Sequence, residues 1–169
     1  MMPLTPFHLG PTLLLGVLLY RWLDLPTLLV GSVIVDVRAA LVVFGPFDGP
    51  VHGILTTFAG GTMVALAIGA VVLVLPQSVQ SVLYYTRLAD TTSVSAIFGA
   101  AIVGVYSHVI LDSLLYTDTH PFYPSAWNPF FIDGVRFIPV YGGCALAGVL
   151  GLIVFAVRHR SDHVPGRST

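Results

Sequence analysis

The sequence predicts an all-α integral membrane protein, a bundle of about five transmembrane helices. Of its 169 residues, 56% are hydrophobic and only 9% are charged, whereas soluble domains carry about 25% charged residues. The apolar residues also gather in runs that approach or exceed the roughly 20 residues needed to cross a bilayer. Composition and run length together favour a membrane protein over a soluble fold.

Five apolar runs define the expected helices. All but the first are long enough to span a bilayer, and they are Leu9–Tyr20, Leu25–Phe44, His52–Leu75, Ser93–Leu115 and Phe137–Val157. The first run is short, so its helix should begin below the interface and leave His8 at the mouth of a shallow cavity. We expect one transmembrane domain over residues 1–157, followed by a polar C-terminal tail over residues 158–169.

The most informative polar residues are His108 and Asp112, which lie four residues apart in the fourth run. This spacing places both side chains on one face of a helix, one turn from each other. Ionisable groups are unfavourable at bilayer depth and usually mark a functional site that faces the bundle interior. A histidine nitrogen and a carboxylate oxygen at this spacing can bind one divalent metal ion. A buried His–Asp hydrogen bond that only fixes helix packing is the alternative.

Threading the five runs up and down through a membrane brings further polar residues to the same side. A rise of about 1.5 Å per residue puts Asp36 about 12 Å from the end of the second helix. By the same rise, His108 and Asp112 lie about 10 and 5 Å from the end of the fourth. His8 precedes the first helix and His52 begins the third, both on that side. The five residues therefore converge on one half of the bundle.

This convergence predicts one metal site. Three histidines and two aspartates suit Zn²⁺ or another first-row divalent ion better than Ca²⁺. Asp36 or Asp112 would serve as a ligand or as a catalytic base. In contrast, we expect Asp118 and Asp133, which lie in the long loop after the fourth helix, to be loop caps or solvated charges. Pairing with Arg38 or Arg136 is the alternative.

The arginines predict the orientation of the chain in the plasma (inner) membrane. Only Arg136 lies in a loop on the side of the site, and the opposite side carries Arg21, Arg87, Arg158, Arg160 and Arg167. The positive-inside rule places the arginine-rich side in the cytoplasm. The N-terminus should then be outside, the C-terminus inside and the site in the extracytoplasmic half.

Several short motifs follow one another in a recognisable order. They are His8, Val35-Asp36-Val37-Arg38, the run His52-Gly53 to Thr57, Ser-His-x-x-x-Asp from Ser107 to Asp112, and the aromatic loop 119–129. In this order the sequence resembles the membrane-bound metal-dependent hydrolases of the YdjM type over most of its length. The resemblance implies a divalent metal ion and hydrolysis of a phosphoester or lipid-like substrate, and it names no particular substrate.

Two positions depart from the pattern of that family. Arg38 stands where the family has a second acid, and Thr56 where it has a second histidine, so a two-metal site would lose ligands while a one-metal site survives. Arg38 becomes a candidate for binding an anionic head group. His120 and Trp127, in the aromatic loop, are further candidate substrate contacts.

Three function classes remain open from the sequence. The first is a membrane hydrolase that uses a metal-activated water, and the second is a non-catalytic accessory subunit of a larger membrane complex. The third, a proton or ion pathway, should continue across the bilayer, yet the opposite halves of the helices are nearly free of ionisable residues. Membrane lipids, and other subunits in the second case, are the expected partners. A net charge of −1 excludes a broad nucleic-acid surface.

Overall fold

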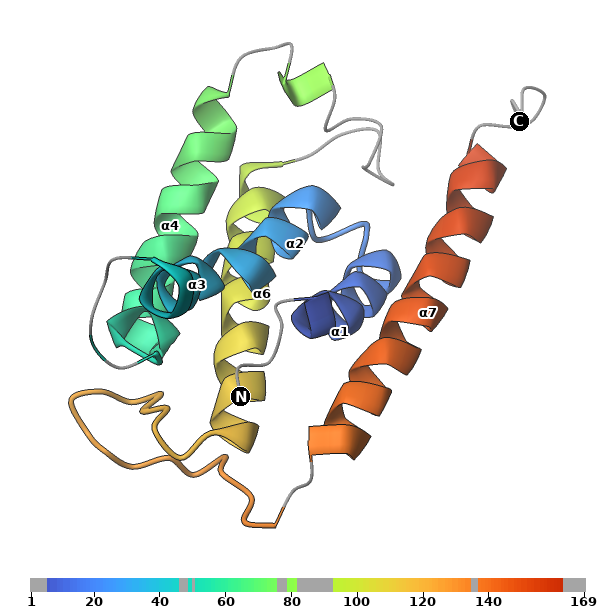
Figure 1. The fold of residues 1–169 in the computed structure, drawn as a ribbon. Helices are drawn as coiled ribbons and strands as arrows, with labels where there is room; N and C mark the ends of the chain where they lie inside the picture. The colour runs from blue at the N-terminus through green and yellow to red at the C-terminus, as the bar shows by residue number, and fades with distance from the viewer. Residues whose placement is uncertain are drawn as a thin grey trace.

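The computed structural model describes residues 6–45, 49, 51–75, 79–81, 93–134 and 137–162. Every regular element in these ranges is a helix, which confirms the all-helical prediction. In chain order the elements are α1 (Pro6–Leu18), α2 (Leu25–Ile34), α3 (Asp36–Phe44), the 3-10 turn η1 (Ile54–Thr56), α4 (Phe58–Val74), α6 (Val94–Leu115) and α7 (Phe137–Asp162). Figure 1 shows α4, α6 and α7 running roughly along one direction.

Three segments among the described residues are long and apolar enough to cross a membrane. They are Leu25–Phe44, which combines α2 and α3, Val94–Leu115, and Ile138–Arg160. The apolar parts of the other two helices, Phe7–Leu18 and Phe58–Val74, are shorter. The helices are therefore typical of a membrane protein, while five complete spans stay a prediction.

Helix α6 lies at the centre of the bundle. It packs against α2 on one side and α4 on the other, around a core that includes Ala101, Val105 and Val109. Glycines let α2 and α6 approach closely: a Cβ added to Gly104 would lie 2.3 Å from the Leu28 carbonyl oxygen. Small residues of this kind are what allow helix backbones to meet inside membranes.

Helix α7 stands at the edge of the bundle and packs against α1. Arg158 fixes the end of α1, because its Nη1 donates a 2.6 Å hydrogen bond to the Val17 carbonyl oxygen. Its guanidinium carbon also lies 4.5 Å from the centre of the Tyr20 ring. The helix continues to Asp162, so Arg158, which the sequence assigned to the polar tail, is part of α7.

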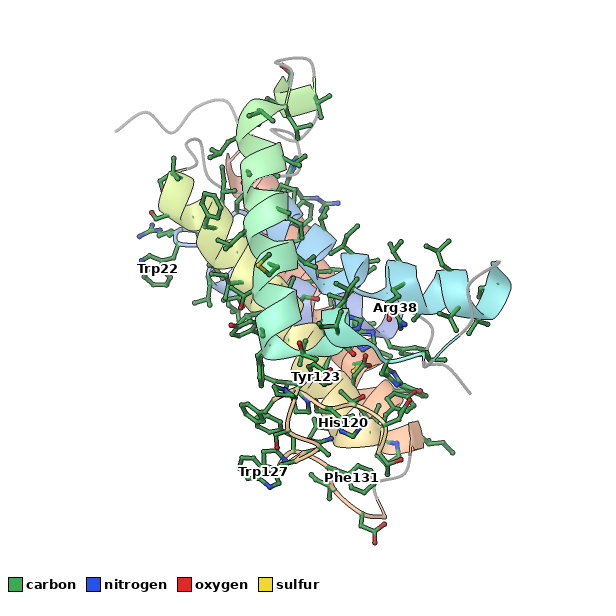
Figure 2. The ribbon with its side chains drawn as sticks, turned by 90° about the vertical axis from the view of Figure 1, so that its left-hand side faces the viewer. Trp22, Arg38, His120, Tyr123, Trp127 and Phe131 are labelled. Carbon is green, nitrogen blue, oxygen red and sulfur yellow. The ribbon has the colours of Figure 1, made fainter. Side chains whose placement is uncertain are left out.

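The second predicted helix is bent. Its apolar run divides at Val35 into α2 and α3, and α3 runs away from the other helices in Figure 2. Asp36 is therefore the first residue of α3 rather than a residue deep inside one straight span. Hydropathy could not reveal this bend, because a straight and a bent apolar run have the same composition.

The third predicted helix begins later than expected. His52 precedes η1 instead of starting a helix, and α4 begins at Phe58. Thr57 is its N-cap, and its side-chain oxygen accepts a 3.0 Å hydrogen bond from the Gly60 amide. Threonine is favoured at this position because it satisfies an otherwise free N–H group of the first turn. The helix therefore begins after its N-cap, Thr57, and not at His52, where the apolar run begins.

The close contact between α2 and α6 gives the first prediction. Gly104→Ala should lower the free energy of unfolding by about 1–3 kcal/mol, the usual effect of overpacking, because the added Cβ would meet a backbone oxygen. Thermal unfolding of the purified protein in detergent measures this effect. Gly142→Ala is the matched control, since a Cβ added there meets nothing within 4 Å. Equal midpoints for the two variants would contradict the prediction.

Candidate metal centre

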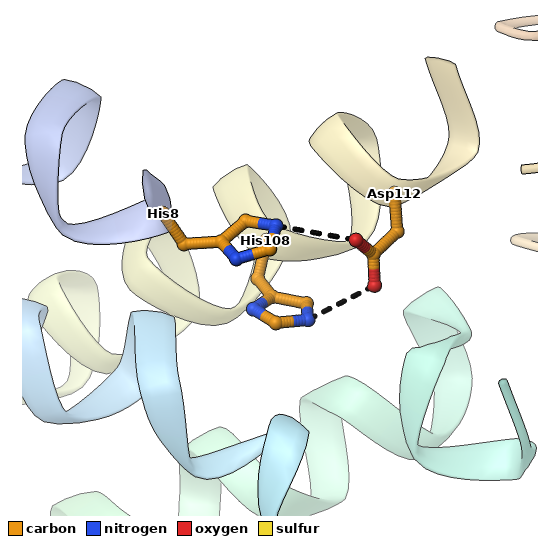
Figure 3. A group of neighbouring side chains, drawn as sticks. All are labelled: His8, His108 and Asp112. Atoms are coloured by element: carbon orange, nitrogen blue, oxygen red, sulfur yellow. Dashed lines mark hydrogen bonds and ion pairs between the residues drawn. The ribbon is translucent and has the colours of Figure 1, made fainter. Parts of the chain in front are cut away.

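Four ionisable side chains from three helices meet inside the bundle. They are His8 from α1, Asp36 from the start of α3, and His108 and Asp112 from α6; Figure 3 shows all but Asp36. Their exposed fractions are 3%, 7%, 0% and 1%, respectively. Two carboxylates are thus almost fully removed from water, which is strongly unfavourable unless a positive charge lies beside them.

The nitrogen and oxygen atoms of this cluster lie close together. His108 Nε2 is 3.0 Å from Asp112 Oδ2 and 3.3 Å from Asp36 Oδ1. His8 Nε2 is 3.1 Å from Asp112 Oδ1, and His8 Nδ1 is 3.8 Å from Asp36 Oδ2. The two imidazole rings stack with their centres 4.1 Å apart. The i, i+4 pair of α6 is therefore the centre of a larger group, as the sequence predicts.

A hydrogen bond fixes the protonation pattern of His108. Its Nδ1 lies 2.7 Å from the Ser32 carbonyl oxygen, and because a carbonyl only accepts, Nδ1 carries the hydrogen and donates. In the neutral imidazole, Nε2 then presents a lone pair to the carboxylates of Asp36 and Asp112. A lone pair and two carboxylates repel one another unless a proton or a metal cation lies between them.

The geometry of the cluster is compatible with a metal cation at this point. His8 Nε2 and Asp112 Oδ1 form a hydrogen bond of 3.1 Å, and His108 Nε2 forms an ion pair with Asp112 Oδ2. His8 Nδ1 and Asp36 Oδ2 are buried without a hydrogen-bond partner. Donor atoms bound to one tetrahedral ion at 2.0–2.1 Å lie about 3.3–3.4 Å apart, slightly farther than the 3.0 and 3.1 Å that separate the Asp112 oxygens from nitrogens of His108 and His8. One ligand atom from each of His8, His108 and Asp112 can be chosen so that all three lie within 4.8 Å of one another. This grouping could hold a metal ion.

His52 reaches the cluster from the loop before α4. Its Nε2 lies 3.8 Å from Asp112 Oδ2, and its Nδ1 lies 2.9 Å from both carboxylate oxygens of Asp118. A carboxylate that accepts a hydrogen bond from one ring nitrogen orients the other nitrogen toward a metal, as in many known sites. The side chain of Asp118 is 54% exposed, in agreement with a solvated charge, but its pairing with His52 was not predicted from the sequence.

Tyr116 forms the apolar wall behind His52. The two rings lie 4.6 Å apart between centres, and the Tyr116 hydroxyl lies 3.4 Å from the hydroxyl of Tyr141. Burial raises the pKa of Tyr116 well above its usual value, and the contact with Tyr141 adds to this effect. The phenol stays protonated at physiological pH, so Tyr116 supports His52 by packing and brings no charge to the cluster.

A pocket of about 480 Å³ lies beside the cluster. It is lined by Arg38, His52, Gly53, Ile54, Thr57, Asp118, His120 and Tyr123. In Figure 2, Arg38 lies at the start of α3, and His120 and Tyr123 lie in the loop beneath the first turn of α4. Because His52 belongs to both the pocket and the cluster, a molecule held in the pocket would lie next to the candidate metal ligands.

The other sequence candidates lie around this pocket or outside it. Trp127 is 65% exposed and stacks on Phe122 with ring centres 5.7 Å apart, and it does not line the pocket. Thr56 is buried, and its hydroxyl donates a 2.7 Å hydrogen bond to the Gly53 carbonyl oxygen. Thr56 therefore stabilises the local turn, in line with the expectation that threonine does not replace the histidine ligand at this position.

The contribution of Asp118 is what sequence reasoning missed. Asp118 lies 66 residues from His52, and no short motif connects the two positions. The bend at Val35, which carries Asp36 to the cluster, has no sequence signal either. No family model, curated protein or solved structure matches this chain.

The carboxylate behind His52 gives the second prediction. Asp118→Asn should lower the affinity for Zn²⁺ by about 10–100-fold, the usual effect of removing the partner that orients a ligand, while every candidate ligand is kept. Competition with a fluorescent zinc chelator measures the affinity. Asp133→Asn, which changes an exposed carboxylate of the same loop, is the control. If Asp118→Asn and Asp133→Asn bind Zn²⁺ equally well, His52 and Asp118 have no part in the site.

Proposed function

We propose that this protein is a membrane-embedded metal-dependent hydrolase acting on a phosphoester or lipid-like substrate. The observation that carries the proposal is the buried group of His8, His108 and Asp112, whose nitrogen and oxygen atoms lie close enough together to hold one metal ion. The resemblance to the YdjM-type hydrolases points to the same chemistry.

The mixture of imidazole and carboxylate ligands suits Zn²⁺. When bound, such an ion lowers the pKa of a water molecule and polarises the oxygen of an ester. Asp112 is placed to be a ligand, because its carboxylate lies within 3.1 Å of nitrogens of both His8 and His108. Asp36 lies near two of the histidines, His8 and His108, whereas Asp112 also lies near His52. Asp36 is also slightly more exposed than Asp112, so we assign it the role of general base.

Elemental analysis and hydrolysis assays test the proposal together. Wild-type protein should carry about one divalent ion per chain and should hydrolyse a chromogenic phosphodiester, with activity lost to a chelator and restored by Zn²⁺. His108→Ala should lose both the metal and the activity, because it removes the nitrogen at the centre of the cluster. His159→Ala, in the last turn of α7, is the matched control and should keep both.

The same assays separate the two carboxylates. Asp36→Asn should keep its metal and lose about 10²–10⁴-fold in kcat, the range for a general base, whereas Asp112→Asn should lose its metal. Wild-type protein that binds no divalent ion would rule out the hydrolase. Loss of metal from Asp36→Asn as well as from Asp112→Asn would contradict the division of roles.

A non-catalytic accessory subunit is the second candidate, and helix α7 is the observation in its favour. This helix packs mainly against α1 and leaves large apolar side chains exposed, among them Leu146, Leu152 and Val157. In a membrane, either lipid or a neighbouring subunit would cover this surface. A metal-free wild-type protein that purifies with a second membrane protein would favour this alternative.

The proposed site lies in the extracytoplasmic half of the inner membrane. Helix α6 ends, and α7 begins, at the end of the bundle that holds the aromatic loop, and α7 runs from there to the opposite end (Figure 1). Arg158 and Arg160 belong to the C-terminal part of α7. The positive-inside rule then places the C-terminus in the cytoplasm.

Cysteine labelling tests this orientation. In a Cys144→Ser background, which removes the single native cysteine, a cysteine at position 2 should react with an impermeant reagent in intact cells. A cysteine at position 168 should react only after the cells are opened. The reverse pattern would show that the site faces the cytoplasm.

A further inference from the structure

Two arginines from distant parts of the chain lie against the same tyrosine ring. Arg21 follows α1, in the turn that leads to α2, and Arg158 lies in the C-terminal part of α7. Their guanidinium carbons lie 5.8 and 4.5 Å, respectively, from the centre of the Tyr20 ring. The packing of α7 against α1 therefore gathers two positive charges at the C-terminal end of α1, whereas His8 of the candidate metal centre lies at the start of that helix.

Each of these guanidinium groups makes one hydrogen bond and keeps further N–H groups for a ligand. Arg21 Nε donates a 3.2 Å hydrogen bond to the Tyr20 hydroxyl, and Arg158 Nη1 donates a 2.6 Å hydrogen bond to the Val17 carbonyl oxygen. The second bond satisfies a carbonyl at the end of α1, which has no partner within its own helix. Because a guanidinium has five N–H donors, each side chain keeps donors that meet no acceptor among the described residues.

The positive charges of Arg21 and Arg158 are not offset by a carboxylate within the described ranges, where neither side chain forms an ion pair. Asp24, the acid nearest to Arg21 in the sequence, is buried at the N-cap of α2, where its side chain accepts a 3.2 Å hydrogen bond from the Thr27 amide. A guanidinium keeps its charge at all physiological pH values. The described residues therefore present two permanent positive charges to a ligand from outside the chain.

Large apolar side chains are exposed beside these charges. Trp22 directly follows Arg21 and is 68% exposed, and Leu18, the last residue of α1, is 52% exposed. Figure 2 shows Trp22 projecting outward from the bundle. The apolar segment Ile138–Arg160, which is long enough to cross a membrane, also ends here. Arginines and aromatic rings at the end of such a segment are typical of the head-group region of a bilayer.

We infer that the surface formed by Tyr20, Arg21, Trp22 and Arg158 binds the head group of an anionic phospholipid. The phosphate accepts hydrogen bonds from the two guanidinium groups, whose planar forks match its oxygens, and the acyl chains lie against Leu18 and Trp22. A zwitterionic head group would bring a positive charge of its own toward the arginines, and a soluble anion would leave the apolar side chains in water. The inference concerns a different surface from the candidate metal centre and does not depend on the proposed function.

Quenching of tryptophan fluorescence by brominated lipids tests the inference. The chain has two tryptophans, so the full-length Trp127→Phe variant keeps Trp22, beside the proposed site, as its single emitter. This variant is placed in phosphatidylcholine vesicles that contain a small share of brominated phosphatidylglycerol or the same share of brominated phosphatidylcholine. The anionic lipid should quench Trp22 more strongly and associate at least about fivefold more tightly, the usual effect of one arginine near an anionic membrane surface.

Substitutions in the Trp127→Phe background identify the charges responsible. Arg21→Gln changes an exposed side chain and should lower the preference for phosphatidylglycerol about fivefold. Arg158→Gln should lower it as well, and thermal unfolding in detergent checks that this variant, which also loses the bond to Val17, is folded. Arg160→Gln is the charge-matched control, because Arg160 is exposed and two residues from Arg158 on α7, so the two do not share a face. It should keep the preference.

The second tryptophan gives the opposite control. Trp22→Phe leaves Trp127 as the single emitter, in the loop after α6 and away from Trp22 in Figure 2, and its quenching should not depend on Arg21. Equal quenching of Trp22 by the two brominated lipids would overturn the inference, and so would a preference that survives Arg21→Gln. A preference of the same size at Trp127 would show a general attraction of anionic lipid to the protein and would overturn the local site as well.

Discussion

The burial of two carboxylates in an apolar helical bundle is the constraint on which the rest of the structure depends. Asp36 and Asp112 are each less than a tenth exposed, and both contact Nε2 of the same imidazole, that of His108. This cluster of buried side chains is stable only when a positive charge or directed hydrogen bonds offset the negative charges of the two carboxylates. The hydrogen bond from His108 Nδ1 to the Ser32 carbonyl oxygen points Nε2 toward the carboxylates. A proton or a metal cation between Nε2 and the carboxylates would offset their negative charge.

The arrangement of the helices follows from this requirement. Ser32 and His108 lie on α2 and α6, and these helices can bring them together because glycines such as Gly104 allow the backbones to touch. The bend at Val35 turns Asp36 toward α6, and the short α1 begins with His8 already inside the bundle. The close packing of α2 and α6, the bend at Val35 and the short α1 therefore each bring residues to the same cluster.

The candidate metal centre and the neighbouring pocket share one residue, His52. One nitrogen of His52 faces Asp112 and the other is bonded to Asp118, while its ring lines the pocket that Arg38 also lines. A molecule in this pocket would therefore lie next to both the candidate metal ligands and Arg38. Thr56, one of the two departures from the YdjM-type pattern, donates a hydrogen bond to the Gly53 carbonyl oxygen and so stabilises the turn that follows His52. Arg38, the other departure, lines the pocket.

The sequence by itself determined the class of the fold and the core of the site. Apolar run length depends only on local composition, so the helices were predictable, and the i, i+4 spacing of His108 and Asp112 follows from the period of a single helix. His8, Asp36 and His52 were predictable as partners because chain threading brings the same ends of successive helices together. Only the tertiary structure decided the bend at Val35, the late start of α4 at Phe58, the bond between His52 and Asp118, and the place of Arg38 over Gly53. These features depend on contacts through space between segments far apart in the chain, and no local pattern of residues encodes such contacts.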